Sequence, residues 1–83
     1  MPLSPRTLTT LRILAAAVRD REPPYAAINP DLAGLAGTLC RLLDIRGGLL
    51  ADNARASTDD SIRAVVSVLA RGGVVVPELE ERS

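Results

Sequence analysis

Apolar residues recur at spacings of three and four over residues 4–20, which is the period of one face of an α-helix. This stripe comprises Leu8, Leu11, Leu14 or Ala15, and Val18. Ser4 is suited to cap the N-terminus of such a helix, and Pro5 is suited to its first turn. The pattern therefore predicts a first helix over residues 4–20. Ile13 and Ala17 form a weaker second stripe, which suggests that this helix is covered on two sides.

A second helix is predicted over residues 30–45. The Pro23–Pro24 pair cannot continue the first helix, and Asn29 followed by Pro30 has the residue types of a helix start. One face of the predicted helix is rich in leucine and the other in small residues. The leucines are Leu32, Leu35, Leu39, Leu42 and Leu43, and the small residues are Ala33, Gly34, Ala36, Gly37 and Cys40. We expect Gly47 to end this helix as a left-handed cap.

A third helix is predicted over residues 58–71. Ser57 or Thr58 would cap it, and the acidic pair that follows would favour its N-terminal dipole from the first turn. Asp59 and Asp60 are that pair, and the core stripe is Ile62, Val65, Val66 and Leu69. This assignment leaves residues 46–57 as a long connection between the second and third helices.

Each of the last two predicted helices ends in Arg-Gly-Gly followed by aliphatic residues. Leu49–Leu50 could be a short strand or a further helical turn, and Val74–Val76 a short strand or an extended arm. If both segments are extended, they could pair as a small ribbon. We expect residues 78–83 to be a flexible tail. The predicted fold is all-α: a single small domain over residues 1–83, built as a three-helix bundle with a short extended or β segment near the C-terminus.

Composition changes this picture in one respect, because the chain is short of bulky core residues. It has 83 residues and 47% hydrophobic residues, yet Tyr25 is the single aromatic residue. A domain of this length buries only about 60–65% of the surface of its unfolded chain. Cys40 is the single cysteine, so no disulfide can form within the chain. Small domains of this kind often depend on association, so we expect a homo-oligomer or a protein partner.

Charge and residue usage exclude several classes of function. Ten arginines balance ten acidic residues, and this zero net charge makes nucleic acid an unfavoured partner. The absence of histidine argues against metal and cofactor chemistry. We expect no membrane association, because no apolar run approaches the roughly 20 residues of a membrane helix. Without a visible signal sequence, we expect a cytoplasmic protein. Arginine without lysine suggests a GC-rich coding sequence, such as those of actinobacteria and their phages.

The small-residue stripe of the second helix is the most informative candidate site. Two glycines within a helix cost about 1 kcal/mol each relative to alanine, and close approach of another backbone is the usual reason to keep them. That backbone could belong to the same chain or to another subunit. The candidate interface residues are Ala33, Gly34, Gly37, Cys40, Val74, Val75 and Val76. We expect Gly37→Leu to disrupt the assembly or the fold by overfilling a tight contact.

The leading hypothesis is a non-enzymatic protein–protein interaction module that self-associates, acting as a small regulator, an inhibitor or an assembly subunit. The valine segment could also add to the edge of a partner's sheet. An enzyme is disfavoured because Cys40 has no histidine to activate it. The adjacent Asp59 and Asp60 do not face each other on a helix.

The alternative hypothesis is a small, dimeric, helix-turn-helix-like DNA-binding regulator. The residues that would contact DNA are Arg63, Ser67 and Arg71, of which the first two share a helix face. The long connection predicted before the third helix weighs against this hypothesis, because a helix-turn-helix needs a tight turn.

Overall fold

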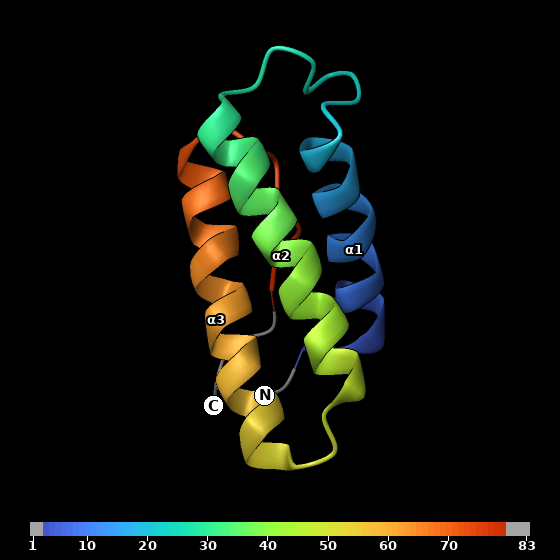
Figure 1. The fold of residues 1–83 in the computed structure, drawn as a ribbon. Coiled ribbons are helices and arrows are strands. Elements are labelled where there is room, and N and C mark those ends of the chain that lie inside the picture. Colours follow the sequence, from blue (N-terminus) through green and yellow to red (C-terminus); the bar gives the residue numbers. More distant parts are fainter. Residues whose placement is uncertain (1–2, 80–83) are drawn as a thin grey trace.

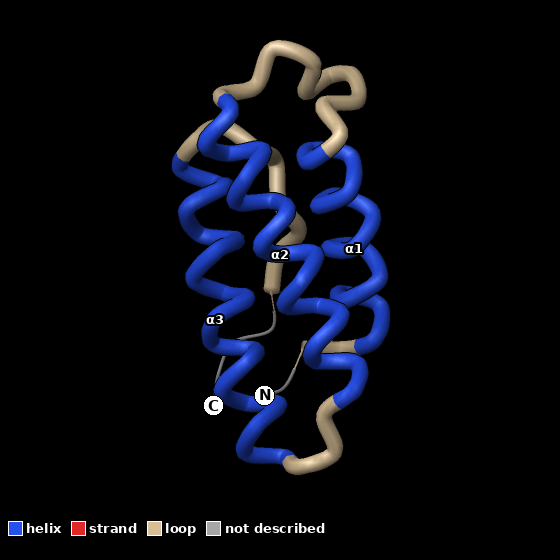
Figure 2. The backbone as a smooth tube through the Cα atoms, viewed as in Figure 1, coloured by secondary structure: helices blue, strands red, loops and turns tan. Residues whose placement is uncertain are grey.

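The computed structural model describes residues 3–79, most of which lie in three helices (Figure 1). The helices are α1 (Pro5–Arg19), α2 (Pro30–Gly48) and α3 (Asp52–Arg71). Residues 3–79 contain no strand, as Figure 2 shows, so the ribbon between Leu49–Leu50 and Val74–Val76 does not form. The prediction of a small three-helix, all-α domain is confirmed. The predicted flexible tail over 78–83 falls mostly outside the described residues.

The two ends of α1 are fixed by local hydrogen bonds. Ser4 is the N-cap, and its Oγ accepts from the Thr7 backbone N–H at 3.2 Å, which confirms the predicted start. At the other end, the Arg21 N–H donates to the Val18 carbonyl at 3.2 Å, and the Glu22 N–H donates to the Ala17 carbonyl at 2.9 Å. This pair of bonds is a Schellman motif, which requires a left-handed residue after the helix. Arg21 adopts that conformation, with φ of 54°.

Helix α2 starts as predicted and ends later than predicted. The Asn29 side chain accepts from the Asp31 N–H at 2.8 Å and caps the helix. The helix then continues through Gly47 to Gly48, so the prediction of Gly47 as a left-handed cap is wrong. In residues 3–79, Gly73 is the glycine with a positive φ, at +97°. The Leu49 N–H closes the last turn of α2 on the Arg46 carbonyl at 3.2 Å.

Helix α3 begins at Asp52, so the predicted cap at Ser57 or Thr58 is wrong, and Asp59 and Asp60 do not lie in the first turn. The N-cap is Ala51, which has no side chain able to accept a hydrogen bond. Instead, the Arg55 guanidinium donates to the Leu49 carbonyl at 3.1 Å and to the Leu50 carbonyl at 2.8 Å. A side chain from inside α3 thus closes the turn before it, and α2 and α3 form a tight helical hairpin.

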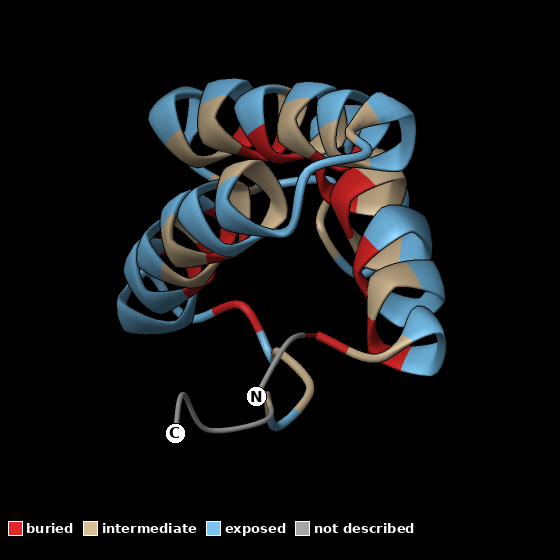
Figure 3. Cartoon of the chain, turned by 90° about the horizontal axis from the view of Figure 1, so that it is seen from below, coloured by how far each residue is buried: buried red, intermediate tan, exposed pale blue. Residues whose placement is uncertain are grey.

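Helix α2 is the centre of the bundle. It packs against both α1 and α3, whereas no Cα atom of α1 lies within 8 Å of a Cα atom of α3. Figure 3 views the bundle from below and shows α1 and α3 splaying apart on the side away from α2. We call this side, between α1 and α3, the open side.

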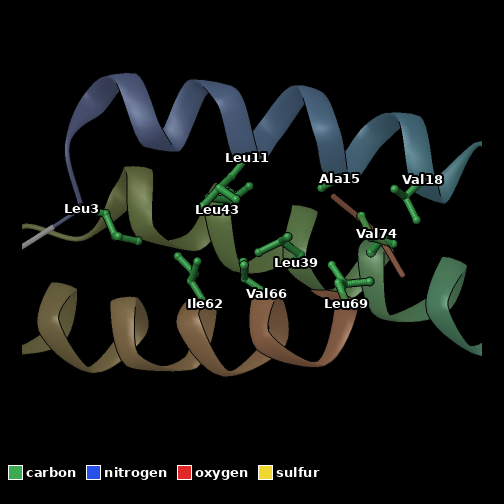
Figure 4. Close-up of a cluster of buried hydrophobic side chains, with 11 residues drawn as sticks. Leu3, Leu11, Ala15, Val18, Leu39, Leu43, Ile62, Val66, Leu69 and Val74 are labelled. Atoms are coloured by element: carbon green, nitrogen blue, oxygen red, sulfur yellow. The ribbon is translucent and has the colours of Figure 1, made fainter. Parts of the chain in front are cut away.

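The open side is covered by the two ends of the described chain rather than by a fourth helix. Leu3 and Val74 are 3% and 4% exposed, and both belong to the main hydrophobic cluster (Figure 4). Val76 and Leu79 pack against the same cluster. We call residues 74–79, which form neither helix nor strand, the C-terminal strap.

The helices contribute aliphatic side chains to one continuous core. The residues at its centre come from the stripes that the sequence predicted. They are Leu11, Ala15 and Val18 of α1, Ala36, Leu39 and Leu43 of α2, and Ile62, Val66 and Leu69 of α3. Leu8, Leu14, Leu32, Leu35, Leu42 and Val65 pack against them and are partly buried.

Candidate functional site

The small-residue stripe of α2 is divided between the core and the surface. Ala33 is buried at 9% exposure, Gly37 and Cys40 are half-buried, and Gly34 is exposed. A Cβ atom added at Gly34 would meet nothing within 4 Å. One added at Gly37 would lie 3.9 Å from Cγ of Arg19, which is an ordinary contact distance. Close packing within this chain therefore requires neither glycine.

This geometry corrects the expectation for Gly37→Leu. A leucine at this position would start from an ordinary contact with the flexible Arg19 side chain and not from a tight backbone contact. The intrachain explanation of the two glycines is wrong for the same reason. The other explanation predicted from the sequence for the two glycines is contact with a second chain.

Gly34 belongs to an exposed row along α2. Residues spaced by three and four along a helix share a face, and this spacing joins Gly34 to Thr38, Arg41 and Ile45. All four are exposed, and Ile45 retains 50% of its surface. We call these four residues the outer face of α2. Its one charged side chain is Arg41, so the row combines small, polar and aliphatic groups.

Charged pairs from α1 border the α2 stripe. Arg12 donates to Asp44 at 2.7 Å across the two helices, and both side chains are exposed. Arg19, which lies against Gly37, donates from Nε to Asp20 at 3.0 Å. This hydrogen bond lowers the pKa of the Asp20 carboxyl group below its usual value. The two pairs form a polar edge beside the α2 stripe.

The three candidate valines near the C-terminus face in different directions. Val74 is buried in the core of its own chain, Val76 is half-buried, and Val75 is 83% exposed. This alternation is that of a segment lying along the open side with one face inward. Val75 alone of the three offers a large apolar surface to solvent.

An apolar hollow of about 370 Å³ lies at the end of the bundle where α3 gives way to the strap. The loop between α1 and α2 forms one wall and the segment after α3 forms the other. The lining residues are Pro24, Tyr25, Ala27, Ile28, Gly72, Gly73, Val74 and Val75. None of these side chains carries a carboxylate, a thiol or an amine, and Tyr25 brings the one hydroxyl group, so the lining side chains are mostly apolar.

The sequence prediction missed a buried ion pair between α2 and α3. Asp59 is 1% exposed, and its carboxylate accepts from Nε of Arg46 at 2.5 Å. The Leu3 backbone N–H also donates to this carboxylate at 3.3 Å. Asp59 lies three residues before Ile62 and seven before Val66, on the same buried stripe. The sequence signal for this ion pair is the presence of an aspartate, Asp59, on an otherwise apolar helix face.

The residues of the DNA-binding hypothesis all lie on α3. Ser67 and Arg71 are exposed, whereas the Arg63 side chain is 20% exposed and lies 3.9 Å from Asp60. The connection of residues 49–51 is short, so the long connection that weighed against this hypothesis is not present. Helices α2 and α3, however, run antiparallel as a hairpin (Figure 1), not crossed as in a helix-turn-helix.

Two kinds of site are not found in residues 3–79. No group of three or more cysteine or acidic side chains is gathered so that it could hold a metal ion. None of the three helices combines the length and apolar character needed to cross a bilayer.

No family model, curated protein or solved structure matches this chain.

Proposed function

We propose that this chain is a non-enzymatic protein–protein interaction module that associates with itself through the outer face of α2. The observation that carries the proposal is the pair of glycines in this helix. Gly34 and Gly37 cost about 1 kcal/mol each in helix stability relative to alanine. Packing within the chain does not require them. A helix of a second copy that faces this row would make direct use of Gly34, because glycine allows two helix backbones to approach closely. Gly37 lies beside the row, next to the flexible Arg19 side chain.

Exposed aliphatic surface supports the same proposal. Large aliphatic side chains that keep 45–88% of their surface are Ile13, Ile45, Leu50, Val68 and Val75. Of these, Ile45 lies in the row that contains Gly34. Burial of apolar surface contributes about 25 cal/mol per Å². A two-fold contact would bury the same row from each copy, since a symmetric dimer uses one patch twice.

The test is Gly34→Leu. Because a Cβ at this position meets nothing within its own chain, the variant should fold at least as stably as the wild type. The leucine would, however, hold the two helices apart. We expect sedimentation velocity to give twice 8.7 kDa for the wild type at micromolar concentration and 8.7 kDa for the variant.

Ala64→Leu is the matched control, because it adds a leucine at an exposed position of α3 and should leave the dimer intact. A wild-type chain that sediments at 8.7 kDa throughout the micromolar range would contradict the proposal. So would a Gly34→Leu variant that remains dimeric.

A further inference from the structure

We infer that two copies of this chain can exchange their C-terminal straps, so that residues 74–79 of each copy cover the open side of the other. Gly72 and Gly73 would act as the hinge. This inference goes beyond the proposed function, because it concerns a different surface, and neither depends on the other.

One backbone hydrogen bond and a few apolar side chains hold the strap in place. The Val74 N–H donates to the Leu69 carbonyl at 3.1 Å. In the described chain, the backbone groups of residues 75–79 make no further hydrogen bond to the protein. Val74, Val76 and Leu79 supply the contacts with the core. Release of the strap therefore breaks few hydrogen bonds, but it uncovers aliphatic surface on both the strap and the open side.

The open side is apolar and is buried by an aliphatic segment. Helices α1 and α3 do not meet. The strap covers most of the space between them (Figures 1 and 3), and Leu3 covers the rest from the other end of the described chain (Figure 4). The strap of a second copy has the same side chains in the same order, so it would make the same contacts. The contacts between strap and core are therefore the same before and after exchange, and only the hinge and the new contacts between the two copies differ. This equivalence is the usual basis of segment swapping.

The hinge has the conformational freedom that exchange requires. After α3, Gly73 turns the chain back along the bundle with φ of +97°, a conformation that glycine adopts without a steric penalty. With an extended conformation at Gly73, the strap would instead continue away from α3. It would then reach a second copy placed end to end with the first.

The surface around the hinge is suited to that second copy. The apolar hollow lies directly beside Gly72 and Gly73, with Tyr25 and Ile28 in its wall. Val75, the first strap residue to face solvent, is 83% exposed. In an exchanged pair the two hinges cross at this end, so the hollows and the exposed valines of both copies come together.

The test changes the hinge residue Gly73 in a chain whose association through α2 is blocked. All variants carry Gly34→Leu. Gly73→Val should favour the exchanged dimer, because a β-branched residue rarely adopts a positive φ. We expect the dimer association constant to rise by about a hundredfold, a factor of ten for each of the two hinges, since about 1.4 kcal/mol of left-handed strain is relieved at each. Sedimentation equilibrium measures this constant.

Two further variants identify the strap as the source of the association. Val76→Asp added to Gly73→Val should return the chain to 8.7 kDa, because a charged strap cannot occupy either open side. Val68→Asp is the matched control: this valine of α3 is 45% exposed and lies outside the strap. It should leave the dimer unchanged.

A second measurement decides the question if Gly73→Val fails to fold. Copies of the Gly34→Leu chain with light and heavy nitrogen are unfolded together, refolded at high protein concentration and examined by native mass spectrometry. Exchange predicts dimers of mixed mass, which Val76→Asp abolishes. The inference is overturned if no dimer of mixed mass forms, or if either dimer survives Val76→Asp.

Discussion

Two glycines show how the same residue type can have opposite effects at the residue scale. Gly73 has a φ of +97°, and its conformation allows the chain to reverse after α3. Gly34 lies inside a helix with open space around it. The first glycine is required by the backbone of its own chain, whereas the second weakens its own helix.

Alanine at these positions should therefore act in opposite directions. Gly34→Ala should stabilise the monomer by about 1 kcal/mol through helix propensity. Gly73→Ala should destabilise it by about 1–2 kcal/mol through left-handed strain. Urea denaturation at a concentration where the chain is monomeric measures both changes. Equal effects of the two substitutions would show that Gly73 does not adopt the left-handed conformation.

At Arg21, a non-glycine residue has a positive φ, so substitution by glycine should stabilise the chain. This residue, with φ of 54°, follows α1 in a Schellman motif, where glycine is the preferred residue. Arg21→Gly should raise the free energy of unfolding by about 1 kcal/mol, because it removes the left-handed strain. Arg19→Gly, inside the last turn of α1, should lower it. Thermal denaturation followed by circular dichroism separates the two outcomes, and a lower melting temperature for Arg21→Gly would contradict the expectation.

At the scale of elements, the Arg46–Asp59 pair fixes α2 against α3. The carboxylate is fully buried and also accepts from the Leu3 N–H. One acidic side chain thus holds two helices and the start of the described chain together. Its position at the N-terminal end of the buried stripe of α3 sets which turn of α3 faces the end of α2.

Asp59→Ala should consequently be among the most damaging single substitutions in the chain. It leaves Arg46 and the Leu3 N–H without this acceptor, and loss of one partner of a buried pair costs about 3–5 kcal/mol. Arg12→Ala is the comparison, since the exposed Arg12–Asp44 pair should contribute less than about 1 kcal/mol. Urea denaturation measures both. Similar losses for the two variants would show that burial does not strengthen the Asp59 contact.

The sequence predicts the helices well because their core stripes have a clear period. The N-termini of α1 and α2 are also predictable, since Ser4 and Asn29 cap them through bonds to nearby residues. The start of α3 is not predictable in this way. Ser57 resembles a cap, but the turn is closed by Arg55, which bonds backwards to two carbonyls before the helix.

The candidate site was predicted only in part, for a related reason. The helical spacing finds Gly34 and Gly37 on α2, but it does not show which of their neighbours α1 and α3 cover. Ala33 and Val74 were candidate interface residues, and both are buried in the monomer. Their burial depends on how segments distant in the sequence pack together, and no local pattern contains that information.

At the scale of the whole molecule, an aliphatic core without phenylalanine or tryptophan is arranged around one central helix. Association through α2 would add to the stability of this small domain by mass action. The wild-type melting temperature should therefore rise with protein concentration, whereas that of Gly34→Leu should not. Differential scanning calorimetry over a hundredfold range of concentration tests this. A melting temperature that does not change with concentration in the wild type would contradict self-association.

The central position of α2 also has a consequence for how the chain is made. Each helix packs on the helix next to it in sequence, so both hairpins can form from local contacts, which favours rapid folding. During translation the three helices emerge before residues 74–79, and proteins tend to fold from the N-terminus as they are made. A nascent bundle is therefore briefly uncovered along one flank. Neighbouring ribosomes on one message would present such flanks to each other at high local concentration.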